Sequence, residues 1–138
     1  MRLSNMADYA VVTMSAAARH CGGVRVSATD LAAETGLPLP TVQKLVSLLT
    51  RAQLLRSARG ANGGLQLARP AAAITLADII EAVEGPIAIA ACCDEGKHDC
   101  ALEGLCSVQP HWSQVNATVR GALAAVPLTE LARPRIAS

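Results

Sequence analysis

Residues 27–68, SATDLAAETGLPLPTVQKLVSLLTRAQLLRSARGANGGLQLA, contain the elements that decide the fold. Ser27 and Asp30 have the spacing of a capping box, so a helix is predicted over 28–35. A stiff turn with two prolines follows, and proline is tolerated in the first turn of the next helix, which we place at 40–52. Two helices joined by a tight turn therefore open this stretch.

A β-hairpin is predicted directly after the second helix. Its strand candidates are 54–58 and 65–68, and the segment between them, 59–64, has glycine-rich turn chemistry. The order helix, turn, helix, hairpin is that of a winged helix-turn-helix unit. In such a unit the second helix enters the major groove of duplex DNA, and a hairpin with a glycine tip, the wing, can approach a minor groove.

The second helix and the wing carry candidate DNA contacts. The apolar positions of 40–52 define one face of the helix and leave polar and cationic side chains on its other sides. Polar side chains read base edges, and neighbouring cations gain affinity by releasing counterions from phosphates. The predicted DNA-binding residues are Thr41, Gln43, Lys44, Ser47 and Arg51 of the helix and Arg59, Asn62 and Gly63 of the wing.

The distribution of charge supports a nucleic-acid partner. The net charge is only +1, but residues 1–70 hold eight basic and three acidic residues, whereas residues 71–138 hold four and eight. No acidic residue occurs between Glu34 and Asp78. Aromatic residues that could stack on single strands are nearly absent, so duplex DNA is favoured. Because some winged helices bind proteins, a protein-interaction module stays open as an alternative.

The rest of the chain is predicted to be helical. Helices are expected over 4–21, over 76–84 and from about 107 to 125. The 27 alanines and the absence of Phe among 138 residues indicate a thin aliphatic core between close helices and argue against an all-β sandwich. We expect a mainly α fold, with a DNA-binding domain over 1–86 and a cysteine loop and a long C-terminal helix over 87–138.

The sequence also predicts a location and a role for its cysteines. No apolar run approaches the ~20 residues that cross a bilayer, and Asp8 interrupts the N-terminal stretch where a signal peptide would be apolar. We therefore expect a cytoplasmic protein with no membrane partner. In that reducing compartment the five cysteines favour metal binding or redox chemistry over disulfides.

Four of the cysteines crowd into one loop: Cys92, Cys93, Cys100 and Cys106. Their wide spacing differs from the C-x2-C pairs of zinc ribbons and from the C-x-x-C of thioredoxin-like sites, and it suits a cofactor larger than one ion, such as an iron–sulfur cluster. Zinc held by three cysteines and either His98 or His111 is the competing interpretation.

These motifs resemble those of the IscR-type iron–sulfur winged-helix regulators, which include the nitric oxide- and iron-responsive repressors of the NsrR and RirA kind. The resemblance covers nearly the whole chain. It rests on the second helix, on the three-cysteine loop and on residues 1–4 (MRLS), 8–11 (DYAV), 59–65 (RGANGGL) and 79–86 (IIEAVEGP). Residues 84–89 (EGPIAI) further resemble the subgroup that regulates the SUF operon for iron–sulfur assembly.

The resemblance implies a DNA-binding transcriptional regulator, here expected to be a repressor, that acts as a homodimer on a double-stranded operator. The long C-terminal helix is expected to cross its twin, and a stripe of side chains on that helix has the spacing to form the seam, although it could equally pack on its own domain: Trp112, Val115, Val119, Leu123 and Val126. A nitric oxide-sensing repressor of the same family is the alternative.

The resemblance also implies one iron–sulfur cluster in each subunit. Its expected ligands are Cys92, Cys100 and Cys106, with Cys92 preferred to Cys93 as the first. Gln109 stands where the 2Fe-2S member has its histidine ligand, and His111 lies two positions further on. Asp8 matches the carboxylate that reaches a 4Fe-4S cluster from the partner subunit in the nitric oxide sensor. We favour a 4Fe-4S cluster with Asp8 as a ligand, and a 2Fe-2S cluster is the alternative.

The sequence contains no catalytic constellation. The glycine-rich turn lacks the Gly-Lys-Ser/Thr ending of a P-loop, and a thiol-dependent redox enzyme would need a low-pKa cysteine beside a substrate pocket. We therefore expect no enzyme and no small-molecule substrate. A zinc-stabilised winged-helix interaction module remains the main rival to an iron–sulfur regulator.

Overall fold

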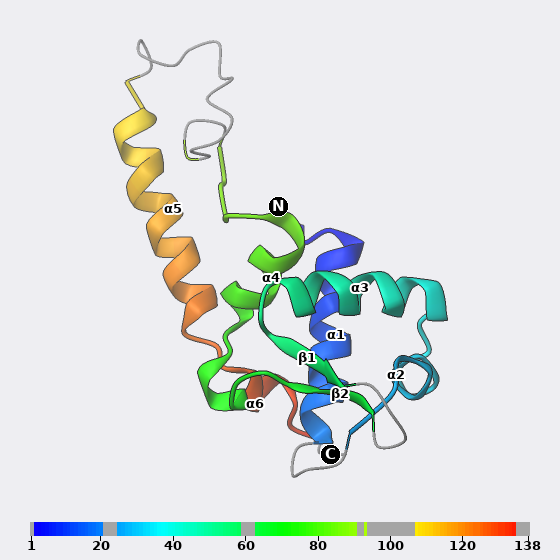
Figure 1. Ribbon diagram of the computed structural model, residues 1–138. Coiled ribbons are helices and arrows are strands. Elements are labelled where there is room, and N and C mark those ends of the chain that lie inside the picture. Colours follow the sequence, from blue (N-terminus) through cyan, green and yellow to red (C-terminus); the bar gives the residue numbers. More distant parts are fainter. Residues whose placement is uncertain (1, 21–24, 59–62, 91–92, 94–106, 135–138) are drawn as a thin grey trace.

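The computed structural model describes residues 2–20, 25–58, 63–90, 93 and 107–134. It confirms a mainly α fold with one small β-hairpin (Figure 1). The elements are α1 (Asn5–Arg19), α2 (Ala28–Thr35), α3 (Leu39–Arg51), β1 (Leu55–Ala58), β2 (Gly64–Leu67), the 3-10 helix η1 (Ala71–Ala73), α4 (Leu76–Glu84), α5 (Gln109–Ala124) and α6 (Leu128–Leu131). None of the described helices is long and apolar enough to span a membrane.

Two helices begin where the sequence places capping boxes. The Ser27 hydroxyl accepts from the Asp30 N–H at 3.0 Å, and the Asp30 carboxylate accepts from the Ser27 N–H at 3.1 Å. Thr75 and Asp78 make the same reciprocal pair at the start of α4. Each pair satisfies donors that a helix start leaves open, so local sequence alone sets these two boundaries.

The hairpin is held to the body by a third extended segment. In the antiparallel pair of β1 and β2, Leu55 is opposite Leu67 and Arg56 is opposite Gln66. Val26 then bridges Leu65 through two backbone hydrogen bonds of 3.1 and 2.7 Å. A Cβ at Gly64 would lie 3.0 Å from the Cβ of Arg25, so this close approach requires glycine.

The core is thin and aliphatic, as the composition predicts. Alanines on the buried face of α1 let neighbouring helices approach, and Met14 fills the centre. The other helices and strand β1 add fully buried aliphatic side chains to the same cluster: Leu31 of α2, Val42, Leu45 and Leu49 of α3, Leu55 of β1, Ile79 of α4 and Leu128 of α6. With no Phe available, each of these side chains supplies a large share of the core.

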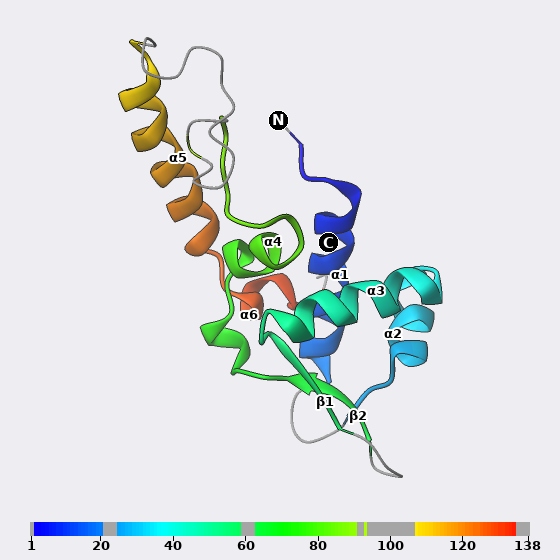
Figure 2. The same ribbon diagram turned by 45° about the horizontal axis from the view of Figure 1, so that its top comes forward.

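The chain returns to the core after α5. The Leu128 N–H donates to the carbonyl of Ile74 at 2.8 Å, and the Leu76 N–H donates to the carbonyl of Val126 at 2.9 Å. Helix α5, which precedes these residues in the chain, lies beside α4 at one edge of the molecule (Figures 1 and 2). The predicted division into domains at residue 86 stays a proposal. Leu128, from the segment 87–138, packs in the core formed by residues 1–86.

The sequence interpretation and the structure differ at three places. Helix α1 spans Asn5–Arg19, whereas the sequence predicts a helix over 4–21. Two short elements, η1 and α6, were not predicted. Both depend on long-range contact, because α6 packs against α1 and η1 rather than forming from strong local signals. The expected stop at Gly22 and Gly23 lies outside the described residues.

An ion-pair cluster joins the end of α1 to the end of α2. Glu34 accepts from His20 Nε2 at 2.6 Å and lies 3.5 Å from Arg19 Nε. The hydrogen bond from His20, helped by the charges of His20 and Arg19, lowers the pKa of the Glu34 carboxyl below its usual 4.5. The cluster fastens the first helix of the helix-turn-helix pair to α1.

We expect Glu34→Gln to flatten the acid limb of the stability profile. A lowered folded-state pKa means that the unfolded chain binds more protons, so the contribution is present above pH 4.5 and is lost as the pH falls below it. Melting temperature followed by circular dichroism across this range should fall less steeply in the variant. The matched control is Glu130→Gln at an exposed position of α6, and an unchanged slope for Glu34→Gln would contradict the assignment.

Candidate nucleic-acid interface and cysteine segment

The exposed side of α3 presents the predicted polar and cationic residues together. Gln43, Lys44, Ser47 and Arg51 are all exposed, and three- and four-residue spacing puts them on one side of the helix. Thr41 is half-buried at the edge of this face. Within the described part of the chain, neither Lys44 nor Arg51 has an acidic partner. Both charges are therefore available to phosphate.

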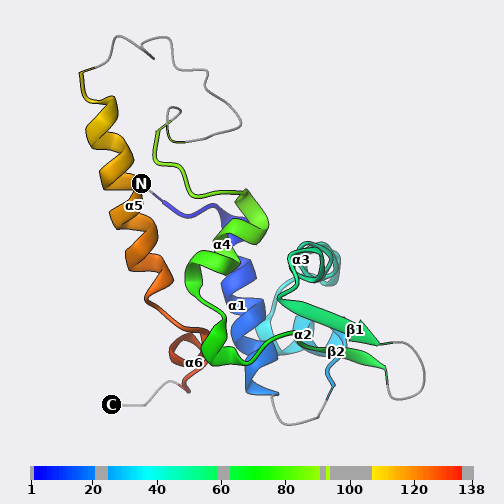
Figure 3. The same cartoon turned by 60° about the vertical axis from the view of Figure 1, so that its left-hand side comes forward.

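The opposite side of α3 is anchored in the core. Val42, Leu45 and Leu49 are fully buried, and α3 packs against α1, α2, α4 and β1. Gly36 ends α2 with φ 78°, a left-handed conformation that glycine adopts without strain. Helix α3 and the hairpin lie together on the side of the molecule away from α5 (Figure 3). This arrangement places a rigid, exposed helix next to a wing.

The wing residues are only partly described. Gly63 is half-buried at the entry to β2. Arg59 and Asn62, the two side chains of the wing that the sequence predicts to contact DNA, lie outside the described residues. Their roles stay predictions.

The described residues of the cysteine segment are few. Cys92, Cys100 and Cys106 lie outside the described part of the chain. Cys93 is half-buried as a free thiol, and its N–H donates to the carbonyl of Ala90 at 2.9 Å. Among the residues that are described, no group of three metal-ligating side chains comes together. The preference for Cys92 over Cys93 as the first cluster ligand therefore stays a prediction from the sequence.

Asp8 is placed at the end of the molecule from which the cysteine segment leaves. It is exposed in the first turn of α1, whose N-cap residue Ser4 donates its N–H to the carboxylate of Glu84 at 3.3 Å. Glu84 is the last residue of α4 and precedes the cysteine segment. In the described structure the Asp8 carboxylate has no hydrogen-bond or ion-pair partner, so it is available to a ligand.

Three side chains, unforeseen from the sequence, fasten residues 87–89 to α4 and α5. Asn116 donates to the carbonyl of Ile87 at 3.0 Å and accepts from the Ile89 N–H at 2.8 Å. Glu81 accepts from the Ile87 N–H at 3.0 Å and from Arg120 at 2.7 Å. We call Glu81, Asn116 and Arg120 the clasp. It fixes the point from which the chain enters the cysteine segment.

The electrostatics of the clasp favour its charged form. Partial burial opposes ionisation of Glu81, but hydrogen bonds from Arg120 and from the Ile87 N–H outweigh it and lower the pKa of this carboxyl. No local pattern marks these residues, because Asn116 and Arg120 act on partners 27 to 39 positions away. Asn116 and Arg120 directly follow Val115 and Val119 of the apolar stripe, and this polar flank is the one signal that the sequence offers.

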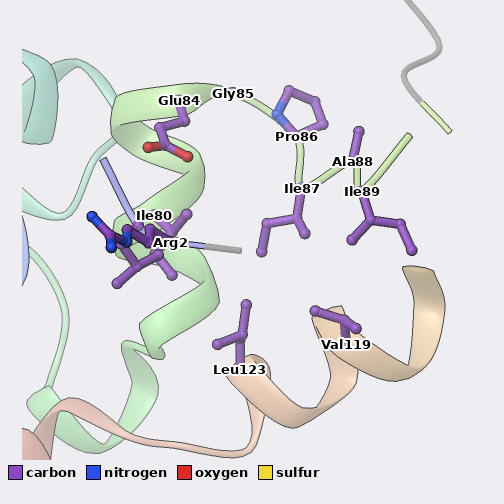
Figure 4. A pocket seen from close by; sticks show the side chains of 11 residues that line it. Arg2, Ile80, Glu84, Gly85, Pro86, Ile87, Ala88, Ile89, Val119 and Leu123 are labelled. Atoms are coloured by element: carbon purple, nitrogen blue, oxygen red, sulfur yellow. The ribbon is translucent and has the colours of Figure 1, made fainter. Parts of the chain in front are cut away.

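An aliphatic hollow of about 420 Å³ lies beside the clasp, between α4, α5 and residues 85–89. Figure 4 shows Ile87, Val119 and Leu123 around a common space, with Arg2 and Glu84 at its border. The expected seam of α5 is therefore divided. Val119 and Leu123 line the hollow, whereas Trp112 and Val115 remain 40% and 42% exposed.

A core-anchored helix-turn-helix pair, an exposed cationic second helix and an adjacent hairpin define a winged helix-turn-helix DNA-binding protein. The model of the Rrf2 family, described as iron-dependent transcriptional regulators, matches residues 3–134. The chain belongs to the Rrf2 family. This membership confirms the predicted resemblance and the assignment as a transcriptional regulator and not an enzyme.

Two relatives agree with this membership over nearly the whole chain. The putative HTH-type transcriptional regulator Rv1287 of Mycobacterium tuberculosis is 34% identical over 133 residues, which cover 96% of this chain and 81% of the relative. The HTH-type transcriptional regulator IscR of Xenorhabdus nematophila is 30% identical over 133 residues, which cover 96% and 80%.

Solved structures show the same fold. CymR, the global cysteine regulator of B. subtilis, superposes with a TM-score of 0.74 at 30% identity and covers 96% of both chains. IscR of T. potens superposes with a TM-score of 0.73 at 27% identity and covers 95% of this chain and 85% of its own. The winged-helix architecture is thus shared with regulators of more than one kind.

Proposed function

We propose that this protein is a homodimeric repressor that reads duplex DNA with α3 and the wing and responds to an iron–sulfur cluster. The observation that carries the DNA-reading part is the exposed face of α3, where Gln43, Lys44, Ser47 and Arg51 lie together without an acidic partner. Thr41, Arg59, Asn62 and Gly63 complete the proposed DNA-binding set. The genes under control are proposed to be those of iron–sulfur assembly, the SUF system, because residues 84–89 resemble that subgroup.

Exposed apolar side chains on α5 support the dimer. Trp112, the only Trp of the chain, and Val115 face solvent on a helix that lies at the edge of the molecule. Large apolar side chains gathered on one surface mark interaction sites more often than free surface. A second copy of α5 would cover these residues and the neighbouring aliphatic hollow. The paired α5 helices would then hold the two α3 helices of the dimer at a fixed separation.

The donor set supports an iron–sulfur cluster. Cys92, Cys100 and Cys106 would supply thiolates, the ligands that iron in such clusters prefers. Asp8 is exposed, has no partner in the described structure and lies one turn of α1 after Ser4, which contacts the end of α4 at Glu84. This position suits a carboxylate ligand offered to the other subunit. When bound, the cluster would supply chemistry that is sensitive to iron and to oxidants. We favour a 4Fe-4S cluster on this basis.

The clasp and α4 give the cysteine segment a fixed relation to the DNA-binding unit. Asn116 and Glu81 hold Ile87, and α4 packs against both α1 and α3. A change of order in the cysteine segment would therefore act on α4, and α4 packs against α3, the helix proposed to read DNA. Any effector acts only through its differential affinity for the two states of the protein.

Anaerobic reconstitution with iron and sulfide, read by native mass spectrometry, tests the cofactor. We expect a dimer with the mass of one 4Fe-4S cluster per subunit, and we expect Asp8→Ala to lower cluster occupancy while leaving the dimer intact. The control is Glu130→Ala, which removes an exposed carboxylate of α6. A 2Fe-2S mass would overturn the cluster type, and equal occupancy in Asp8→Ala would overturn the ligand. A colourless protein with stoichiometric zinc would favour the rival interpretation.

A further inference from the structure

The outer face of the hairpin carries a basic surface that the predicted DNA-binding residues do not include. Side chains alternate across a strand, and Leu55, Leu65 and Val26 all face the core. Their neighbours Arg56, Gln66 and Arg25 therefore lie on the opposite face. Arg25 and Arg56 are exposed, and Gln66 is half-buried between them.

Gln66 orients the guanidinium of Arg56. The two residues are directly opposite in the hairpin, and the side-chain amide of Gln66 lies 2.6 Å from both Nε and Nη2 of Arg56, with hydrogen bonding that requires its oxygen to face the guanidinium. Because this partner is neutral, Arg56 keeps its full positive charge. Its remaining N–H donors are held in a defined direction by an element of regular structure.

A hollow of about 340 Å³ lies between the two arginines and is lined by Arg25, Arg56, Ser57, Ala58 and Gln66. The described residues that line it supply cationic, hydroxyl and amide groups and no carboxylate. Arg56 and Gln66 belong to the stretch between Glu34 and Asp78 that has no acidic residue. The chemistry of this hollow matches a phosphate, since arginine forks bind phosphate oxygens in two parallel hydrogen bonds.

The position on the hairpin identifies the source of the phosphate. The hairpin projects from the body on the same side of the molecule as α3 (Figure 3). We propose that Arg25 and Arg56 bind a backbone phosphate of the DNA duplex, beside the groove that the wing approaches. This inference rests on the proposed function and adds a contact that fixes position without reading sequence.

The dependence of DNA affinity on salt tests the proposal. Fluorescence anisotropy would give Kd against salt concentration for an operator duplex and for a scrambled duplex, using full-length wild type, Arg25→Gln, Arg56→Gln and the double variant. Each neutralised phosphate contact contributes about 0.9 to the slope of log K against log salt. A homodimer carries two copies of the site, so we expect the double variant to lower the slope by up to about 1.8. Each single variant should lower it by part of that amount, and every variant should weaken both duplexes by the same factor.

Matched variants separate this contact from its alternatives. Arg133→Gln, at an exposed position after α6, should leave the slope unchanged, and Arg56→Lys should retain most of it. Wild-type slopes in both Arg25→Gln and Arg56→Gln would overturn the phosphate site and would leave the surface to a partner such as an acidic protein. If the wild type binds no duplex at all, the proposed function fails, and this site fails with it.

Discussion

Leu49→Ala is expected to lower the free energy of unfolding by about 2–5 kcal/mol, the range for removing a buried leucine side chain from a core. Leu49 is fully buried on the inner side of α3, and its carbonyl accepts the N–H of Leu54, where the chain turns toward β1. The cavity would open between α3 and the rest of an aliphatic core that contains no Phe to fill it. Since small domains have about 5–15 kcal/mol in total, this loss is a large fraction.

Urea denaturation followed by circular dichroism measures this effect. The midpoint should fall while the slope of the transition stays constant, because the surface exposed on unfolding is nearly the same. Leu3→Ala is the matched control, since the same atoms are removed from a side chain that is 47% exposed. A Leu49→Ala midpoint equal to that of Leu3→Ala would show that α3 is not anchored as described.

Gln43→Ala is expected to remove about 1–3 kcal/mol of discrimination between base pairs in each half-site, which is about 5- to 150-fold. Gln43 is exposed at the centre of the polar face of α3, and a glutamine amide can pair with adenine through two hydrogen bonds. The charge of the protein is unchanged by the substitution. Affinity for the operator should therefore fall, while affinity for a scrambled duplex and the salt slope should stay the same.

Anisotropy titrations of both duplexes give the ratio of specific to non-specific affinity. Gln114→Ala serves as the control, because it makes the same change at an exposed position of α5, far from α3 along the chain. An unchanged ratio in Gln43→Ala would remove this residue from the recognition surface. A parallel loss on both duplexes would instead indicate a general weakening of the unit that carries α3.

The parts of the fold that the sequence predicts well are those with local causes. The capping boxes at Ser27 and Thr75 set helix starts within a few residues, and the glycine at position 36 ends α2. The apolar stripe of α3 predicts which of its side chains are exposed, so Gln43, Lys44, Ser47 and Arg51 lie together as expected. In each case the deciding interaction is made within one turn of helix.

The parts that the sequence does not predict depend on distant partners. Helix α6 exists where Leu128 reaches the core and bonds Ile74, more than fifty positions earlier, and the clasp forms only because Asn116 meets Ile87. The orientation of Arg56 is of the same kind, since it is set by the cross-strand partner Gln66. Counting charges along the sequence places Arg56 in a basic stretch, but it does not show on which face of the hairpin the side chain lies.

The central claim is that α3 of this protein reads a specific duplex sequence, and selection from a pool of random DNA duplexes tests it most directly. The full-length wild type, purified anaerobically, and the Gln43→Ala variant would be taken through the same rounds and the bound duplexes sequenced. The account predicts that wild type enriches a two-fold symmetric site with half-sites about one helical turn apart, ~34 Å, and that Gln43→Ala loses a preference within each half-site. Folded wild-type protein that enriches no sequence would contradict it.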